Sequence, residues 1–487
     1  MPFPLIAIVI AIASFALNVI SALLRPKTSD RPDKDWDIPT ATEGRSIPVV
    51  WGTDLQRAPN IIWWGDQREV RRNNIWRYFT GIAWALAHGA PTLKAIIVNE
   101  KVIWTGTLTH GQELFLNLPN LFGQASGGIV WDLKYYQGNG TPGADPYLAS
   151  RVSGYPDHRR VAYLVSRGPA TWTLGSNWKG FIGNSPNLPK VEFELERFPD
   201  VPSWSAIGGD ANPIWMLYEA LTNNVWGCGV DPADAFEGID DASFQSAANQ
   251  VAAEGLGASY ILQESMQFPR FADMILRHVD AVLYREPTNG KWTVKLIRDD
   301  YDPASLPILD ETNIIEVQEF GTDVAGNLRD VVRIKFADRS KQYKESVATF
   351  RNPAVRAIQG YSSAVELDFP MVRDPGVAQR IAEREALGYS YPLRRLRVTA
   401  TRKAANLRPG SVFRFVWAGY DVDAIFRVTS IRLGSPTDGV VIVEAVEDKF
   451  SIASATIGAP PLPPPPPEDP PPPEDPPDGP PDGPPTE

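Results

Sequence analysis

The stretch that most constrains this chain lies near its N-terminus and carries no charge. From Leu5 to Leu24 every side chain is uncharged and most are apolar, and the run ends at Arg25, Pro26 and Lys27. As an α-helix the run would be roughly 30 Å long, about the thickness of the hydrocarbon core of a bilayer. No Lys or Arg precedes it, which argues against a cleaved signal peptide. Taken alone, the run therefore predicts a transmembrane anchor.

The same run also contains small and polar residues through which apolar helices contact one another. A bundle-forming face would consist of Ala7, Ala11, Ser14 and Asn18, which are three or four residues apart. The apolar side chains that would insert in a membrane or fill a tube are Leu5, Ile6, Ile8, Val9, Ile10, Ile12, Phe15, Leu17, Val19, Ile20, Leu23 and Leu24. Both arrangements, in a membrane or in a bundle of copies, fit this sequence.

The other end of the chain cannot join a packed core. Residues Pro460 to Glu487 read PPLPPPPPEDPPPPEDPPDGPPDGPPTE, and proline lacks an amide proton and has a fixed φ. Extended as polyproline II, at about 3.1 Å per residue, this tail would reach on the order of 85 Å. It holds seven acidic residues and no basic one, and removing them from the net charge of -11 leaves -4.

Composition excludes several classes of protein. The 487 residues predict two to four domains, and 43% hydrophobic content is enough for real cores. A net charge of -11 argues against a nucleic-acid binder with a broad basic face, although it leaves room for a short contact with passing DNA. A single cysteine, Cys228, permits no intramolecular disulfide, which fits folding in a reducing compartment.

The patterns of apolar residues predict an α+β chain with β-rich parts around a short helical section. We expect a hydrophobic helix at 1–25, a linker at 26–43, a β-rich domain at 44–200, a helical and mixed domain at 201–312, one or more β-rich domains at 313–455 and a proline-rich acidic tail at 456–487. Among the strands, Asn99-Glu100 predicts a tight hairpin turn.

The helical section carries clear start and stop signals. Asn212-Pro213 supplies an N-cap followed by a proline at the first helical position. A second helix is capped by Asp240 or Asp241 and stops at Gly255. A third is expected over Arg270–Tyr284, running into a strand, and a later one at VAQRIAEREAL.

No catalytic constellation emerges. Residues 138–143 match G-x-G-x-x-G, but a proline lies inside the motif and no βαβ unit follows, so the interpretation is a surface loop. The four histidines are isolated, and Cys228 between two glycines is expected to be a small packed residue. Acidic clusters at 231–241 and 299–302 lack the EF-hand order, so we interpret them as loops and helix caps. The sequence predicts no enzyme, no cofactor and no metal site.

Tryptophans crowd the first β-rich domain, at Trp51, Trp63, Trp64, Trp76, Trp84 and Trp104. A platform for a sugar or a base is one interpretation. Packing in a core or a subunit interface is the commoner role, and it is favoured because these residues lie at strand periodicity among other apolar residues.

Four stretches resemble the central hub and tip-attachment proteins of tailed bacteriophages. They are GRSIPVVWGTDLQRAPNIIWWGD at 44–66, IVNEKVIWTG at 97–106, the segment from RRVAYLVSRG to KVEFELER, and NPIWMLYEALTNNVWGCGVD at 212–231. The last is the most specific, with Cys228 in place of the usual apolar residue. Matching motif residues are Pro48, Gly52, Trp63, Trp64, Asn184, Pro189, Asn212, Pro213, Leu221, Thr222, Asn223, Trp226, Gly227 and Gly229.

The resemblance covers roughly 44–452 and implies a structural protein with no catalytic residues. It implies a homotrimeric ring, the tail-tip or baseplate hub of the virion, which closes the distal end of the tail tube and provides a channel for DNA ejection. The implied partners are further copies of the chain, distal tail or tube proteins, the tape-measure protein and, during infection, the host membrane and the phage DNA. Assembly is expected in the host bacterial cytoplasm.

One departure and two alternatives accompany this interpretation. Longer members continue into receptor-binding regions, whereas this chain has the proline-rich tail after Phe450, so we expect the tail to hold a separate fibre or receptor-binding protein. The alternatives are an envelope protein anchored by Leu5–Leu24, and a cell-wall hydrolase carried on the tail. In the trimer, the apolar run is expected to plug the tube and later to meet the host membrane.

Overall fold

The computed structural model describes Trp36 and residues 46–140, 143–169, 178–201, 204–322, 328–435, 437 and 439–451. The apolar run, the tail predicted at 456–487 and all of the predicted linker except Trp36 lie outside these residues. Among the residues described, no helix is both long and apolar enough to cross a membrane. The bundle-face, plugging and membrane-inserting roles of the run therefore stay predictions.

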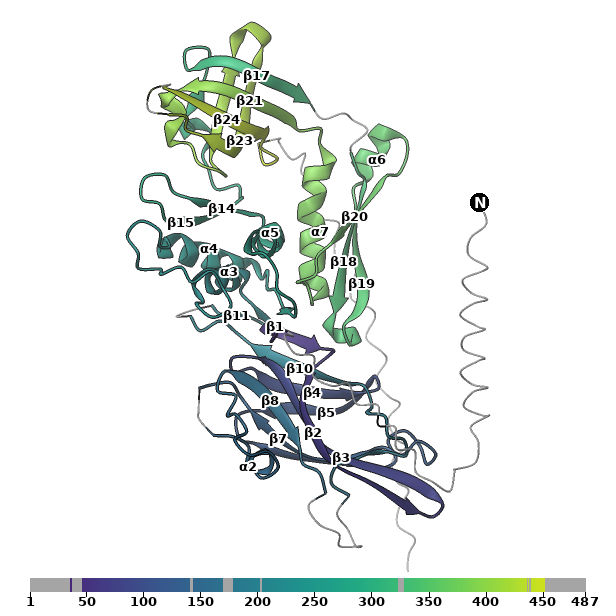
Figure 1. The fold of residues 1–487 in the computed structure, drawn as a ribbon. Helices are drawn as coiled ribbons and strands as arrows, with labels where there is room; N and C mark the ends of the chain where they lie inside the picture. The colour runs from purple at the N-terminus through teal and green to yellow at the C-terminus, as the bar shows by residue number, and fades with distance from the viewer. Residues whose placement is uncertain are drawn as a thin grey trace, which may run out of the picture.

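Two antiparallel sheets form the first part of the described chain, at the bottom of Figure 1. One has the strand order β13-β1-β10-β4-β5, and the other has the order β2-β3-β8-β7-β6, with β9 pairing with β3 and β7. Their buried side chains share one core around Trp84, Trp131 and Phe193, so the sheets pack face to face. The bounds are β1 Val49–Gln56, β2 Asn60–Arg72, β3 Ile75–His88, β4 Thr92–Val98, β5 Lys101–Leu108, β6 Glu113–Leu118, β7 Ile129–Tyr136, α2 Pro146–Ala149, β8 Val161–Ser166, β9 Phe181–Gly183, β10 Val191–Arg197 and β13 Tyr260–Leu262.

Two hairpins of this sandwich turn at residues with positive φ. Asn99 (47°) and Glu100 (64°) connect β4 to β5, which confirms the predicted turn, and Asn73 (52°) and Asn74 (60°) connect β2 to β3. Two-residue turns with both φ values positive match the twist of antiparallel strands. Asparagine tolerates this conformation better than most residues, so the Asn-Asn pair fixes the register of the long β2–β3 hairpin.

Helices α3 (Pro213–Thr222), α4 (Asp241–Glu254) and α5 (Phe268–Val279) follow the sandwich, after the short strands β11 (Ala206–Ile207) and β12 (Asp210–Ala211). The Asn212 side chain accepts a hydrogen bond from an amide in the first turn of α3, and Asp240 does the same for α4. Helix α4 stops at Gly255, whose φ of 67° is left-handed. These caps and this stop confirm the sequence prediction.

The third helix is shorter at its C-terminal end than the sequence predicted. Asp280 takes a left-handed conformation with φ 54°, and strand β14 (Ala281–Arg285) begins at the next residue. Strand β14 pairs with β15 (Trp292–Leu296). The prediction of a helix up to Tyr284 is wrong because the apolar periodicity continued into residues that pair as a hairpin.

Helix α7 (Pro375–Ser390) packs on a three-stranded sheet of order β19-β18-β20. The inner face of this sheet, with Ile334 and Phe336, shares a buried core with Ile381 of α7, with α3 to α5 and with Trp51 of β1. One core therefore continues across residue 312, where the sequence predicted a domain boundary. The bounds are β18 Val331–Asp338, β19 Lys344–Arg351, α6 Pro353–Gln359 and β20 Ala364–Asp368.

The last part is a six-stranded sheet of order β16-β22-β23-β24-β21-β17, at the top of Figure 1, with its own core around Phe413 and Phe426. Its strands are β16 Ile308–Leu309, β17 Ile314–Thr322, β21 Arg394–Thr401, β22 Val412–Trp417, β23 Val422–Arg432 and β24 Val440–Glu447. Short 3-10 turns in this and the preceding part are η1 Pro303–Ser305, η3 Arg339–Lys341, η4 Arg402–Asn406 and η5 Ala418–Tyr420. The described chain is thus β-rich α+β.

The tryptophans of the first part serve its cores. Trp51 and Trp84 are fully buried, and Trp63, Trp64, Trp76 and Trp104 are half-buried and pack against core clusters. This packing agrees with the core role that the sequence favoured.

Candidate functional site

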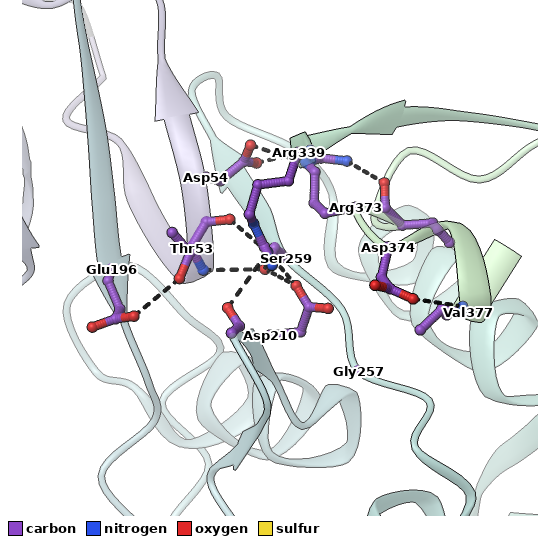
Figure 2. Close-up of polar contacts among 12 residues, drawn as sticks. Thr53, Asp54, Glu196, Asp210, Gly257, Ser259, Arg339, Arg373, Asp374 and Val377 are labelled. Atoms are coloured by element: carbon purple, nitrogen blue, oxygen red, sulfur yellow. Dashed lines mark hydrogen bonds and ion pairs between the residues drawn. The ribbon is translucent and has the colours of Figure 1, made fainter. Parts of the chain in front are cut away.

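Charged and hydroxyl side chains gather where the sandwich, the helical part and the β18–α7 part meet (Figure 2). We call this cluster the junction and define it as Thr53, Asp54, Glu196, Asp210, Ser259, Arg339 and Arg373. Its members come from β1, β10, β12, the segment before β13, the turn after β18 and the segment before α7.

The most buried pair of the junction is Asp54 with Arg373. The Nε and Nη2 atoms of Arg373 donate to Oδ1 and Oδ2 of Asp54 at 2.9 and 2.8 Å. The side chains are 7% and 9% exposed, and Nη1 of Arg373 donates to two backbone carbonyls of its own segment. Burial lowers the pKa of Arg373, but the charge and hydrogen bonds of Asp54 raise it, and the net shift is upward. The bidentate geometry fixes both partners.

Arg339 connects all three parts of the chain. Its Nη2 pairs with the carboxylate of Asp210 and donates to the carbonyl of Thr53 at 2.9 Å and to Oγ of Ser259 at 3.1 Å. The Ser259 hydroxyl in turn donates to Asp210 at 2.6 Å and accepts from the amide of Thr53 at 3.1 Å. One guanidinium thus contacts β1, β12 and the segment before β13.

Gly52 allows β1 to approach this cluster. Its φ is 66°, and a Cβ at this position would lie 2.1 Å from Oγ of Ser259 and 2.9 Å from the amide nitrogen of Ala211. Any other residue would force the strand away from Ser259. The motif glycine is therefore required by the junction.

A phenol and two carboxylates extend the junction along β10. Thr53 Oγ1 donates to Glu196 at 3.1 Å, and the hydroxyl of Tyr343 donates to Glu194 at 2.6 Å. Burial, and then the charge of Glu194, raises the pKa of Tyr343, so the phenol stays protonated. Arg57 donates to the carbonyl of Tyr343 at 2.8 Å. This extension ties the turn after β18 to the sandwich.

The polar groups of the junction bind one another. It contains no histidine or cysteine that would act as a base or a nucleophile at neutral pH. A buried ion pair contributes little net stability, but removal of one partner leaves an uncompensated charge and is costly. The junction therefore selects one arrangement of the three parts.

An aromatic cluster lies next to the junction. The ring of Trp51 stacks on Phe271 at 5.1 Å and meets Trp226 edge-on at 5.3 Å between centroids. Trp51 Nε1 donates to Glu219 at 2.7 Å, and Glu219 also pairs with Arg197 of β10. The motif residue Trp226 thus packs helix α3 and its following turn against β1.

Other motif residues of the 212–231 stretch shape α3 and the turn after it. Asn212 caps α3 and also donates through Nδ2 to a carbonyl of α4 at 3.0 Å, while Pro213 occupies the first helical position and Leu221 is fully buried. Thr222 donates through Oγ1 to the carbonyl one turn earlier at 3.0 Å. These residues dock α3 on α4.

The turn after α3 depends on three more motif residues. Asn223 Oδ1 accepts hydrogen bonds from the amides two and three residues later, at 2.9 and 3.1 Å. A Cβ on Gly227 would lie 2.5 Å from a carbonyl oxygen of α3, and Gly229 has φ 69°. Cys228, between them, is exposed, so the prediction of a packed cysteine is wrong. Partial burial raises the pKa of its thiol, which disfavours a nucleophilic thiolate.

The remaining motif residues lie in the sandwich, away from the junction. The carbonyl of Pro48 accepts from the amide at the end of β3 at 2.7 Å, and Trp63 packs edge-on against a tyrosine of α2. Trp64 packs against the sandwich core. Asn184 donates through Nδ2 to two carbonyls of the loop between β6 and β7, and Pro189 is half-buried before β10.

The described chain offers no other chemical centre. Among the residues described, no group of three or more His, Cys, Asp or Glu side chains could hold a metal ion. In the acidic loop before α4, Asp231 and Asp234 accept hydrogen bonds from backbone amides. An open groove of about 600 Å³ on the last sheet is lined by the ion pairs Arg394–Glu447 and Arg414–Asp423, which neutralise each other.

Sequence reasoning singled out none of the seven junction residues. Of its neighbourhood only Gly52 was singled out, from the motif resemblance. One signal was available, because Asp54 is the single charge in the strand VVWGTDLQ. Nothing local marks Arg339 or Arg373, which lie about 300 residues further along the chain.

Part of the chain matches a family of phage tail proteins. Residues 298–431, which include most of the last sheet and the β18–α7 part, match the model of a phage tail protein family, Phage-tail_3. No curated protein matches the chain.

Comparison with solved structures gives one similarity that bears on the fold. A chain in the virion of a native gene transfer agent particle is similar with a TM-score of 0.50 and 15% identity, over 92% of this chain and 97% of that chain. The 43 kDa tail protein of prophage MuSo2 from Shewanella oneidensis gives a TM-score of 0.32 at 10% identity, covering 83% of this chain and 98% of that one. A tail protein from Neisseria meningitidis MC58 gives 0.31 at 10% identity, covering 75% and 98%. Only the first similarity is high enough to bear on the fold.

Proposed function

We propose that this chain is a structural tail-tip hub protein of a bacteriophage or phage-like particle. Three copies form a ring that closes the distal end of the tail tube, attaches tip or fibre proteins and provides the channel through which DNA leaves. Its place is the tail tip of the virion, after assembly in the host cytoplasm.

The observation that carries the proposal is the shared fold over nearly the whole chain. The similarity to the gene transfer agent virion chain spans 92% of this chain. The phage tail family matches a segment of 134 residues at 298–431. The hub motifs in the first 231 residues lie entirely outside that segment and support the same class of protein.

The junction supports a structural role. A ring subunit transmits force between neighbours, so its parts must keep one relative position. The buried Asp54–Arg373 pair and the contacts of Arg339 hold three parts of the chain in such an arrangement.

Exposed apolar side chains support assembly with other copies. Phe236, Ile358 and Tyr420 are 76%, 79% and 80% exposed in the single chain. Covering such side chains in an assembly removes apolar area from water, which favours association.

Two measurements test the proposal: the mass of the protein in solution and its location on the particle. Light scattering on the purified full chain should give three times the mass of 53.7 kDa, and antibody labelling of particles should mark the tail end distal to the head. A monomer, or label elsewhere on the particle, would overturn the proposal.

Two other functions give different outcomes in simple assays. An anchored envelope protein would fractionate with the membranes of uninfected cells. A cell-wall hydrolase would clear peptidoglycan in a zymogram, although among the described residues no catalytic pair of side chains stands out.

A further inference from the structure

The outer end of the β2–β3 hairpin is strongly basic in an acidic protein. Its sequence, REVRRNNIWR at 68–77, has four arginines and one glutamate, whereas the whole chain carries a net charge of -11. Figure 1 shows this end of the hairpin extending past the rest of the sandwich. A concentration of positive charge on a projecting ribbon favours the binding of an anionic partner.

Three of the four arginines lie on one face of the ribbon. The register places Arg72 opposite Ile75, Val70 opposite Arg77, and Arg68 opposite Phe79. Residues directly opposite each other and residues two apart share a face of an antiparallel pair. The packing agrees with this, because Val70 and Phe79 belong to one apolar cluster whose Trp178 ring lies 4.8 Å from the Arg77 guanidinium.

The charges on this face are not neutralised within the described part of the chain. No carboxylate described there forms an ion pair with Arg68, Arg72 or Arg77, although other arginines of the sandwich, such as Arg151, have such partners. Glu69 points to the opposite face of the ribbon by the same register. Burial, and then the charge of Arg72, lowers the pKa of Arg77, which is the effect expected of neighbouring cations with no anion between them.

We propose that this arginine face binds the phosphate backbone of double-stranded DNA, so that the hairpin is a DNA contact of the hub; this rests on the proposed function. Along the ribbon the three arginines lie at successive same-face positions, about 6.6 Å apart. That spacing is about twice the 3.4 Å axial rise between phosphates of one DNA strand. A two-stranded ribbon is also narrow enough to lie along a groove of the duplex.

The apolar residues of the hairpin argue against a membrane as the partner. Val70 and Trp76 pack against core clusters of the sandwich, and neither belongs to the strongly exposed apolar side chains. A membrane-inserting tip would present such side chains to the acyl region. The accessible chemistry of this face is guanidinium, which prefers phosphate oxygens.

The test compares two charge-matched double variants of the full chain. R68Q/R72Q removes two charges from the arginine face. R333Q/R351Q removes two exposed arginines, one in β18 and one in β19, that form no ion pair with any described residue. Fluorescence anisotropy with a 20-base-pair duplex is measured from 50 to 200 mM salt. R68Q/R72Q should weaken binding at least tenfold and reduce the salt slope by about 0.9 for each lost phosphate contact. R333Q/R351Q should bind as the parent does, and R68K/R72K should retain most of the binding.

The outcomes separate this inference from the hub proposal. Unchanged DNA binding by R68Q/R72Q overturns the inference, and so does tighter arginine-dependent binding to polyglutamate or to anionic phospholipid vesicles than to DNA. Light scattering on the same samples reports the trimer independently. A trimer without arginine-dependent DNA binding refutes only the inference, whereas a monomer that binds DNA through these arginines refutes only the hub.

Discussion

At the scale of single residues, the junction shows how a few contacts fix a large protein. Asp54 and Arg373 are separated by more than 300 residues in sequence, yet they form a bidentate pair that is almost sealed from water. The pair is specific because each charge is stable in that position only with its partner present.

Removing one partner of this pair should be much worse than removing both. R373M leaves Asp54 buried without a counterion, and we expect a loss of about 3–5 kcal/mol in the free energy of unfolding. The double variant D54L/R373M removes both charges and should recover a large part of that loss. Urea denaturation of the three proteins measures the difference.

The control for this cycle is an exposed ion pair on the last sheet. Arg414 and Asp423 are 42% and 54% exposed, so R414M should leave the free energy of unfolding nearly unchanged. If R373M is no more destabilising than R414M, the junction does not hold the parts together.

A second prediction concerns pH and the buried His278. Burial, and then the charge of Arg384, lowers the pKa of His278 to about 4, and its Nε2 lies 3.0 Å from the carbonyl of Gly257. The folded state therefore binds this proton less readily than the unfolded state, whose pKa is about 6.5. Stability from this group is complete above pH 6.5 and is lost as the pH falls towards 4, by about 3 kcal/mol.

The pH dependence of unfolding in two variants tests this. H278Q keeps an N–H donor for the Gly257 carbonyl but cannot be protonated, so its stability should fall less between pH 6.5 and 4 than that of the parent. H110Q is the matched control, because it makes the same substitution at a histidine that is partly exposed. An equally steep loss in H278Q would assign the acid sensitivity to other groups.

At the scale of elements, local signals in the sequence were sufficient where the physics is local. The caps Asn212 and Asp240, the stop at Gly255 and the turn at Asn99-Glu100 act within a few residues, and all four are present. The end of α5 was not predictable in the same way. The pairing of β14 with β15, which is not local to the helix, overrides the apolar periodicity there.

The candidate site was less predictable than the elements, for a related reason. Arg339 and Arg373 look like ordinary surface arginines in sequence, and only the tertiary fold brings them to β1. The motif residues were found by resemblance, and their roles as caps, turn formers and close contacts became visible only with their neighbours. Gly52 is an example, since its conformation and the nearness of Ser259 explain it together.

The acidic tail is the element whose removal tests attachment. If Pro460–Glu487 holds a separate fibre protein, particles that carry the deletion should assemble tails but lose that protein, because an extended proline-rich segment acts as a docking or spacing arm. Electron microscopy and the protein composition of purified particles measure this. Substituting the seven acidic residues by Gln and Asn separates charge from reach, and fibres that remain on deletion particles would refute the role.

At the scale of the whole molecule, the sandwich, the helices and the β18–α7 part are joined by contacts and present two kinds of free surface. One core continues from β1 through the helices to α7, and the junction closes its polar side. The projecting hairpin then offers positive charge, while Phe236, Ile358 and Tyr420 offer apolar area. These surfaces suit two different partners, an anionic one and further copies of the chain.

The last prediction asks what the apolar run contributes to the assembled ring. If Leu5–Leu24 from three copies plug the tube and later meet the host membrane, deletion of residues 2–24 should leave the protein trimeric, since the junction and cores lie elsewhere. It should impair sealing of the tube or delivery of DNA, measured as genome retention and as transfer into cells. Replacing only Ala7, Ala11, Ser14 and Asn18 by Leu keeps the run apolar but removes the small and polar residues of the predicted bundle face. Loss of delivery in both variants favours a plug, loss in the deletion alone favours a purely membrane role, and normal delivery by the deletion refutes both.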